Sequence, residues 1–329
     1  MVAMGTLMPR KARAAGPRLV RVHTDAEAGV AVVELSDKER SNTISHDLAE
    51  DVALAADSIR NLDGIRAIML HGAGQHFSVG VNPYNYISDS RAPLVASAYS
   101  CEKLLDGFVK LRGLRIPFVC AVHGKLIGAA LAASLNADFI VAHADASFCH
   151  GNIVRGVCPL GMLSRTLVKS VGSSRALQMY LTNKTLTGAD ALSFGLVHEL
   201  CSGSIEATHK RAASVARQLA QDSEQAAAIL DARDPIDPER LAAEAVGHAS
   251  CLDANGGRYA NSVLPSADDP LPTGFAETLL DASLDTLAHG DEPPGVHEAE
   301  VPATLNQAVM ADILKWPEAA LLVIRGLPE

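Results

Sequence analysis

Apolar residues along this chain form two kinds of pattern, short continuous runs and helical spacing. These patterns predict its strands and helices. Residues 30–35 and 65–70 are short apolar runs rich in β-branched side chains, which is typical of strands. Between them, Leu48, Val52 and Ile59 fall at the spacing that places side chains on one face of a helix. A strand, a helix and a strand therefore follow one another, as in proteins built around a parallel sheet.

The most informative pattern covers residues 118–131. An entirely apolar run is followed by Gly124 and then, after Gly128, by a run of small residues. The pattern predicts a buried strand, a sharp turn and the start of a helix. N–H groups in the first turn of a helix have no partner within the helix, so this turn suits a developing oxyanion.

The alternation of strand and helix continues through residues 117–148, so the predicted fold class is α/β with largely parallel strands. Residues 204–232 are rich in Ala, Gln, Arg and Glu, which predicts helix. Proline clusters at residues 235–238, 265–272 and 293–294 indicate breaks between later segments of the chain. We divide the chain into a flexible tail, a core, C-terminal helices, and a linker with a further segment: residues 1–18, 19–203, 204–262 and 263–329.

The last segment repeats an order seen near the start of the chain. Residues 305–314 have a helical pattern, and residues 319–326 read as a strand that ends in glycine. Residues 42–72 show the same helix, strand and glycine in the same order. The segment is either the opening of a second copy of the fold or a chance helix–strand pair.

Composition narrows the function classes. The 329 residues suffice for a sizeable core, and with 48% hydrophobic but only 4% aromatic residues that core must consist of Ala, Val, Leu and Ile. A formal net charge of −10 argues against nucleic acid as the main partner. The basic residues Arg10, Lys11, Arg13 and Arg18 are expected to form a solvated tail, with a poorly formed targeting segment as the alternative.

The six cysteines contain no C-x-x-C pair, and several fall in apolar runs. This usage indicates free thiols in a reducing compartment, so we expect a cytoplasmic protein with no metal site. No apolar run approaches the roughly 18 residues that a membrane span needs. We therefore expect no membrane partner.

Five blocks of the chain form a further pattern, at residues 35–42, 74–82, 123–130, 137–148 and 181–197. Taken together, these blocks resemble the crotonase (enoyl-CoA hydratase/isomerase) superfamily. Each block alone is weak evidence, but their joint order and spacing cover about residues 19–260. The resemblance implies a spiral of ββα turns with a C-terminal helical region that assembles trimers or hexamers. It also implies an acyl thioester substrate on CoA or an acyl carrier protein, and no further cofactor.

The resemblance places an oxyanion hole on two backbone N–H groups, those of Val81 and Ala129. Each follows a glycine, Gly80 and Gly128, which belong to the substrate-binding loops. The family usually has glycine where this chain has Ala129. Alanine still donates its N–H, although its methyl group takes up space near the thioester.

The two glutamates of family hydratases would fall on Ala132 and Asn152. Neither residue exchanges a proton at neutral pH, so the two-carboxylate hydration mechanism is not expected. Decarboxylation fits better, because loss of CO2 generates the enolate without a base. A neutral Asn152 also does not repel a substrate carboxylate. In this respect the chain resembles crotonase-like decarboxylases of polyketide β-branching pathways.

Four further residues are candidates for the site, and each has a plainer alternative. His150 shares strand parity with Asn152 and is a candidate proton donor; alternatively it points away from the pocket. Tyr84 and Tyr86 are expected to cap the pocket, or only to pack in a loop. Arg155 is a candidate partner for a substrate carboxylate, or a surface residue.

Two other functions stay open at this point. The chain is a hydratase, dehydratase or isomerase if another residue replaces the missing base. It is a catalytically silent homologue that binds thioesters or holds partner subunits if nothing replaces it.

Overall fold

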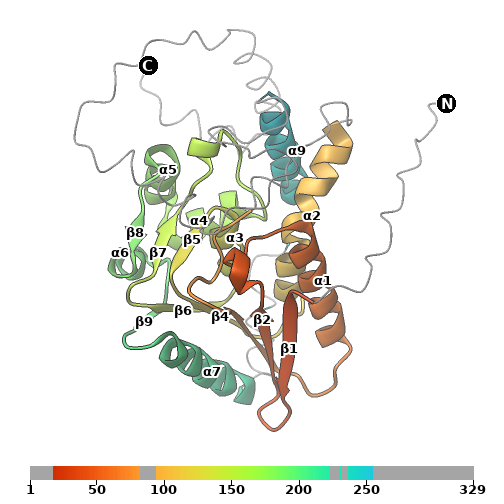
Figure 1. Cartoon of the computed structure of the whole chain (residues 1–329), viewed down its shortest axis with the longest axis vertical. Helices are drawn as coiled ribbons and strands as arrows, with labels where there is room; N and C mark the ends of the chain where they lie inside the picture. Colours follow the sequence, from red (N-terminus) through yellow and green to blue (C-terminus); the bar gives the residue numbers. More distant parts are fainter. Residues whose placement is uncertain (1–17, 82–93, 223–229, 231–235, 255–329) are drawn as a thin grey trace, which may run out of the picture.

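The structure is a computed structural model that describes residues 18–81, 94–222, 230 and 236–254 (Figure 1). Three expectations fall outside these residues. They are the flexible tail before residue 18, the capping role of Tyr84 and Tyr86, and the second copy within residues 263–329. They remain predictions.

A six-stranded sheet forms the centre of the fold, in the order β1-β2-β3-β4-β6-β9. Its strands are Val20–Asp25, Val30–Leu35, Ala67–Gly72, Phe118–Val122, Phe139–His143 and Glu199–Cys201. β1 is antiparallel to β2, and every later pair in the sheet is parallel. This confirms the predicted α/β class, although β3 begins two residues later than the apolar run suggested.

Side chains along the central strands alternate between two hydrophobic cores. On β3, Ile68 and Leu70 belong to the larger core, whereas Ala67 and Met69 belong to the smaller. On β4, Phe118 and Cys120 belong to the larger core, whereas Val119 belongs to the smaller. Because successive strand residues face opposite sides, a sheet with two covered faces needs such continuous apolar runs.

Different helices cover the two faces. Helix α7, Ile205–Gln221, contributes Ala212, Val215 and Ala216 to the smaller core and lies below the sheet in Figure 1. The larger core contains apolar residues of α1 (His46–Arg60), α2 (Leu94–Arg112) and α9 (Pro238–Ala254). Ser45 begins α1 by accepting a hydrogen bond from the Leu48 N–H at 3.2 Å. Leu48, Val52 and Ile59 of α1 are buried, as their spacing in the sequence predicted.

A second, three-stranded sheet carries the glycine turns. It consists of β5 (Lys125–Ile127), β7 (Ser147–Cys149) and β8 (Leu186–Thr187). The predicted order of strand, turn and helix at residues 118–131 is confirmed, with β5 as an unpredicted addition between the turn and the helix. Helix α3, Ala129–Ser134, follows Gly128 directly.

Shorter elements complete the core and lead to the C-terminal helices. They are η1 (Lys38–Arg40), η2 (Ile153–Arg155), α4 (Leu163–Val171), α5 (Ser173–Thr182) and α6 (Gly188–Phe194). The helix predicted over 204–232 is present to Gln221 as α7. Both α7 and α9 pack on their own chain. An additional role for this region in oligomerisation stays a prediction.

Candidate functional site

The glycine turns and α9 together line a partly open cavity of about 70 Å³. Its lining comes from four parts of the chain: the segment ending at Val81, the β5–α3 junction, the segment from Cys149 to Leu163, and α9. The lining residues are Val79, Val81, Ile127, Gly128, Ala129, Cys149, Gly151, Asn152, Val154, Arg155, Val157, Leu160, Leu163 and His248. The expected site residues Val81, Ala129, Gly128, Asn152 and Arg155 are among them.

Gly80 fixes the direction of the Val81 N–H. The Gly80 carbonyl accepts a hydrogen bond from the Ile44 N–H at 2.8 Å. A trans peptide holds its C=O and N–H on opposite sides, so the Val81 N–H is directed away from Ile44. Among the described residues, no acceptor receives this N–H. It is therefore available to a bound group at the cavity.

Ala129 supplies the second N–H as the first residue of α3. Gly128 precedes it at φ 55°, a conformation that glycine adopts without strain, and its own N–H is held by the Cys149 carbonyl at 3.1 Å. No acceptor within the described part of the chain receives the Ala129 N–H. A Cβ built on Gly80 would lie 3.7 Å from the Ala129 nitrogen, so the two loops meet at this point.

The two positions that resemble the glutamates of family hydratases lie in different surroundings. Ala132 is fully buried within α3 and does not line the cavity. Asn152 lines it, and its Nδ2 donates to the Cys158 carbonyl at 3.0 Å. Its Oδ1 is buried and finds no hydrogen-bond partner among the described residues. Asn152 therefore presents a fixed amide, and no ionisable group, to the site.

Arg155 places a positive charge at the cavity. It is the last residue of η2 and is partly exposed. Its guanidinium stays protonated at all physiological pH values. The described lining residues include no Asp or Glu.

His150 does not lie where the parity argument placed it. The chain leaves the extended conformation after Cys149 and turns at Gly151, with φ 69°, so His150 and Asn152 are not on one strand face. The imidazole is 2% exposed, packs edge-on against the Tyr180 ring with centroids 4.9 Å apart, and does not line the cavity. Burial lowers the pKa of His150 to about 4, with the Asn152 side chain partly offsetting that effect. The ring is therefore neutral near pH 7.

His248 is the lining residue that sequence reasoning missed. It lies on α9, and its Nδ1 contacts the Cys158 carbonyl at 2.6 Å. A carbonyl only accepts, so Nδ1 carries the hydrogen and the neutral ring keeps its lone pair on Nε2. Burial lowers the pKa of His248 to about 4. Its spacing with Ala245, Ala249 and Leu252 on one helix face was the sequence signal for a buried histidine.

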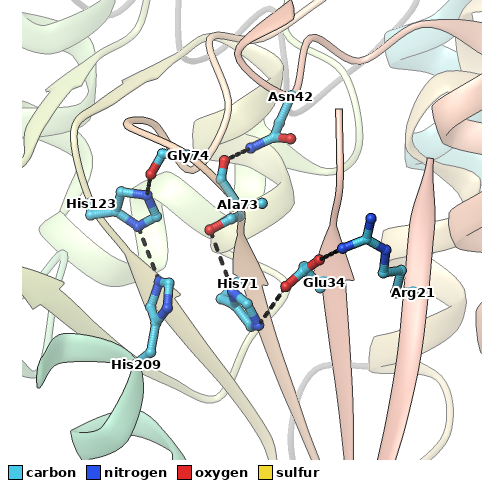
Figure 2. Close-up of polar contacts among 9 residues, drawn as sticks. Arg21, Glu34, Asn42, His71, Ala73, Gly74, His123 and His209 are labelled. Atoms are coloured by element: carbon cyan, nitrogen blue, oxygen red, sulfur yellow. Dashed lines mark hydrogen bonds and ion pairs between the residues drawn. The ribbon is translucent and has the colours of Figure 1, made fainter. Parts of the chain in front are cut away.

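A separate group of histidines joins α7 to the large sheet (Figure 2). His209 Nε2 lies 3.4 Å from His123 Nδ1, and the His71 and His209 ring centroids are 4.3 Å apart. His123 Nε2 in turn contacts the Gly74 carbonyl at 3.1 Å. We call His71, His123 and His209 the histidine cluster. Within the described residues, no group of His, Cys, Asp or Glu has the arrangement of a metal site.

Among the described residues, no helix combines the length and apolar character needed to cross a membrane.

Known proteins resemble this chain over most of the described core. The model of the family described as enoyl-CoA hydratase/isomerase matches residues 25–239. The probable enoyl-CoA hydratase EchA12 of Mycobacterium tuberculosis is 31% identical over 174 residues, which are 51% of this chain and 61% of that protein. The trans-2-decenoyl-[acyl-carrier-protein] isomerase of Streptococcus mutans is 26% identical over 54% of this chain and 68% of its own length. The match with EchA12 thus spans less than two thirds of that relative.

Solved structures share the fold at lower identity. An enoyl-CoA hydratase from Mycobacterium avium subsp. paratuberculosis superposes with a TM-score of 0.61 at 21% identity, over 74% of this chain and 99% of that one. An enoyl-CoA hydratase from Bacillus halodurans gives a TM-score of 0.63 at 18% identity, over 71% and 94%. These structures establish the crotonase fold that the five sequence blocks suggested. With the family match over residues 25–239, the chain belongs to the enoyl-CoA hydratase/isomerase family.

Proposed function

We propose that this protein binds an acyl thioester, on CoA or on carrier-protein pantetheine, and decarboxylates its acyl group. The N–H groups of Val81 and Ala129 hold the enolate oxygen that forms. Family membership supports the thioester, because the relatives are named for enoyl-CoA and for a decenoyl carrier protein. These names leave both carriers open.

One observation carries the choice of reaction. The cavity combines two unoccupied backbone N–H donors with the Arg155 guanidinium and contains no carboxylate among its described residues. Hydration through two glutamates needs acidic groups at this place. A substrate that brings its own carboxylate meets no repulsion from these lining residues, and an arginine among them suits a carboxylate.

The reaction then needs little from side chains. Arg155 binds the leaving carboxylate, and the C–C bond breaks so that its electrons enter the thioester carbonyl. Each N–H donor lowers the barrier by roughly 3 kcal/mol when it is aimed at the developing oxyanion in a site without bulk water. Asn152 keeps the wall of the cavity uncharged. A water molecule protonates the enolate carbon, since His150 and His248 are both neutral near pH 7.

The required substrate is an acyl group that carries its own carboxylate. Malonyl, methylmalonyl and 3-methylglutaconyl thioesters have the required carboxylate and cover a useful range of sizes.

A second candidate is hydration or double-bond isomerisation, and His248 favours it. Because Nδ1 donates to the Cys158 carbonyl, the lone pair of the neutral ring is on Nε2, and a general base needs such a lone pair. The names of the relatives fit this function at least as well as decarboxylation. His248 would then be the relocated base, in place of His150.

Mass spectrometry of a thioester panel separates these candidates. The purified protein is incubated with the three carboxylated thioesters and with crotonyl-CoA. Decarboxylation predicts loss of CO2 from the carboxylated members and no addition of water to crotonyl-CoA, with both results unchanged in His248→Gln. Water addition or isomerisation that His248→Gln abolishes would support the second candidate instead. Tight binding without any product would support a catalytically silent homologue.

A further inference from the structure

Two thiols that are far apart in sequence meet beside the cavity. The Sγ atoms of Cys158 and Cys251 lie 3.6 Å apart, although 93 positions separate the residues. Cys158 follows η2 in a segment without regular structure, and Cys251 lies on α9. Both are free thiols and both are partly exposed.

The geometry is close to that of a disulfide. An S–S bond is about 2.05 Å long, so the two sulfur atoms need to approach by only about 1.5 Å. Cys158 itself lies outside helices and strands, so its side chain has more room to move than that of Cys251 on α9. The other partly exposed thiol, Cys201, contacts the carbonyl of Ser202 instead.

The two thiols also differ in reactivity. Either thiol can donate to the other sulfur, and when Cys158 is the donor this hydrogen bond lowers the pKa of Cys251. The same hydrogen bond, together with burial, raises the pKa of Cys158. Cys251 is therefore the thiol of the pair that ionises more easily, and the thiolate is the nucleophilic form.

We propose that Cys158 and Cys251 are a modification site at which a hydroperoxide forms a reversible intramolecular disulfide. The Cys251 thiolate attacks a peroxide oxygen, the O–O bond breaks, and Cys251 becomes a sulfenic acid while one water or alcohol leaves. The Cys158 thiol then attacks the sulfenic sulfur, the S–S bond forms, and a second water leaves. Two thiols have lost two electrons and two protons, and the peroxide has gained them.

A disulfide between Cys158 and Cys251 would affect the residues that line the cavity. The Cys158 carbonyl accepts from both Asn152 and His248, at 3.0 and 2.6 Å. Cys251 lies three residues after His248, on the same side of α9. The disulfide thus joins α9 covalently to the segment that positions two cavity residues. Its formation needs no thioester and does not depend on the proposed function.

Titration of the full chain with hydrogen peroxide tests this proposal. We expect the oxidised protein to lose two of its six thiols, counted after denaturation, and to yield a peptide pair joined through Cys158 and Cys251. Dithiothreitol should restore both thiols. The melting temperature should rise by roughly 5 °C on oxidation, because the crosslink closes a long loop in the unfolded chain.

Matched variants complete the test. Cys251→Ser and Cys158→Ser should each abolish the crosslinked peptide and the loss of two thiols, whereas Cys201→Ser should leave both unchanged. The proposal is overturned if the wild-type protein keeps all of its thiols under peroxide. It is also overturned if the disulfide joins other cysteines or two chains, or if Cys251 is oxidised to sulfinic acid while Cys158 stays reduced.

Discussion

Gly80 lies so close to the Ile127 carbonyl group that position 80 has no room for a side chain. A Cβ at Gly80 would sit 2.3 Å from the Ile127 carbonyl oxygen, a distance that real Cβ atoms essentially never show. Gly80 also has φ 92°, which disfavours any side chain. This contact holds the loop ending at Val81 against the loop that begins α3. The two proposed oxyanion donors therefore depend on one glycine for their relative position.

Gly80→Ala should separate the two loops and misplace the Val81 N–H. We expect turnover of the thioester substrate to fall by about 100-fold or more, since this is the usual cost of one oxyanion donor. Steady-state kinetics measures the loss, and circular dichroism with thermal melting verifies that the variant is folded.

Gly64→Ala is the matched control. Gly64 has a similar φ of 79°, but a Cβ there meets no atom within 4 Å. The strain of a left-handed alanine, about 1–2 kcal/mol, is thus retained without the steric contact. If Gly64→Ala loses as much turnover as Gly80→Ala, the loss reflects general destabilisation and the argument for the Gly80 contact fails.

Ala129→Pro removes the second donor with little cost to the fold. Proline is favoured at the first position of a helix because its missing N–H has no intrahelical partner. We expect kcat to fall by about 100- to 1,000-fold. Ala129→Gly keeps the N–H and should retain most of the activity. Turnover in folded Ala129→Pro at the wild-type rate would show that the hole is placed incorrectly.

Arg155→Gln should weaken binding of carboxylated thioesters selectively. A hydrogen bond between charged groups contributes about 1.5–3 kcal/mol, so KM for a malonyl or methylmalonyl thioester should rise by about 10- to 100-fold. The affinity for propionyl-CoA, which lacks the carboxylate, should not change. Arg175→Gln is the control, because Arg175 lies over the Phe194 ring on a different part of the surface. Equal losses for carboxylated and plain thioesters would refute the role of Arg155.

The histidine cluster predicts how stability depends on pH. Burial lowers the pKa of His123 to about 4 and that of His209 to about 3, and it also lowers the pKa of His71. In the unfolded chain the pKa of each histidine is about 6.5, so the unfolded state binds protons more tightly than the folded state. Protonation of these histidines therefore favours unfolding. The nearby carboxylates of Glu34 and Glu206 offset only part of this effect.

Stability from the histidine cluster is complete above pH 6.5 and is lost as the pH falls towards 4. For fully buried His123 the loss is on the order of 3 kcal/mol in the free energy of unfolding. Urea denaturation at pH 7.5, 6, 5 and 4 measures it. His209→Phe should flatten the dependence, and an equally steep dependence in that variant would count against the cluster as its source.

The fold could be predicted from the sequence where the signal is local. The apolar runs of β2 and β4 and the helical spacing in α1 mark their elements directly. β5 was missed because its three residues are held by pairing with β7, a contact about twenty residues away that no local pattern encodes.

The candidate site shows the same limit. Val81 and Ala129 lie in the motif blocks, and Asn152 and Arg155 follow the block at residues 137–148 closely, so all four were found. His248 comes from α9, almost a hundred residues after Asn152. The error for His150 has a local cause. Strand parity applies only to extended backbone, and the positive φ of Gly151 ends it one residue before Asn152.

Infrared spectroscopy of a bound thioester tests most directly whether the two backbone amides hold charge on the substrate oxygen. Propionyl-CoA labelled with carbon-13 at the thioester carbonyl is bound to the wild-type protein, to Ala129→Gly and to Ala129→Pro. Two hydrogen bonds to that oxygen predict a C=O stretch clearly lower than in water for the wild type and Ala129→Gly, and a smaller shift for Ala129→Pro. A carbonyl frequency that is the same in all three proteins and equal to that in water would contradict the account.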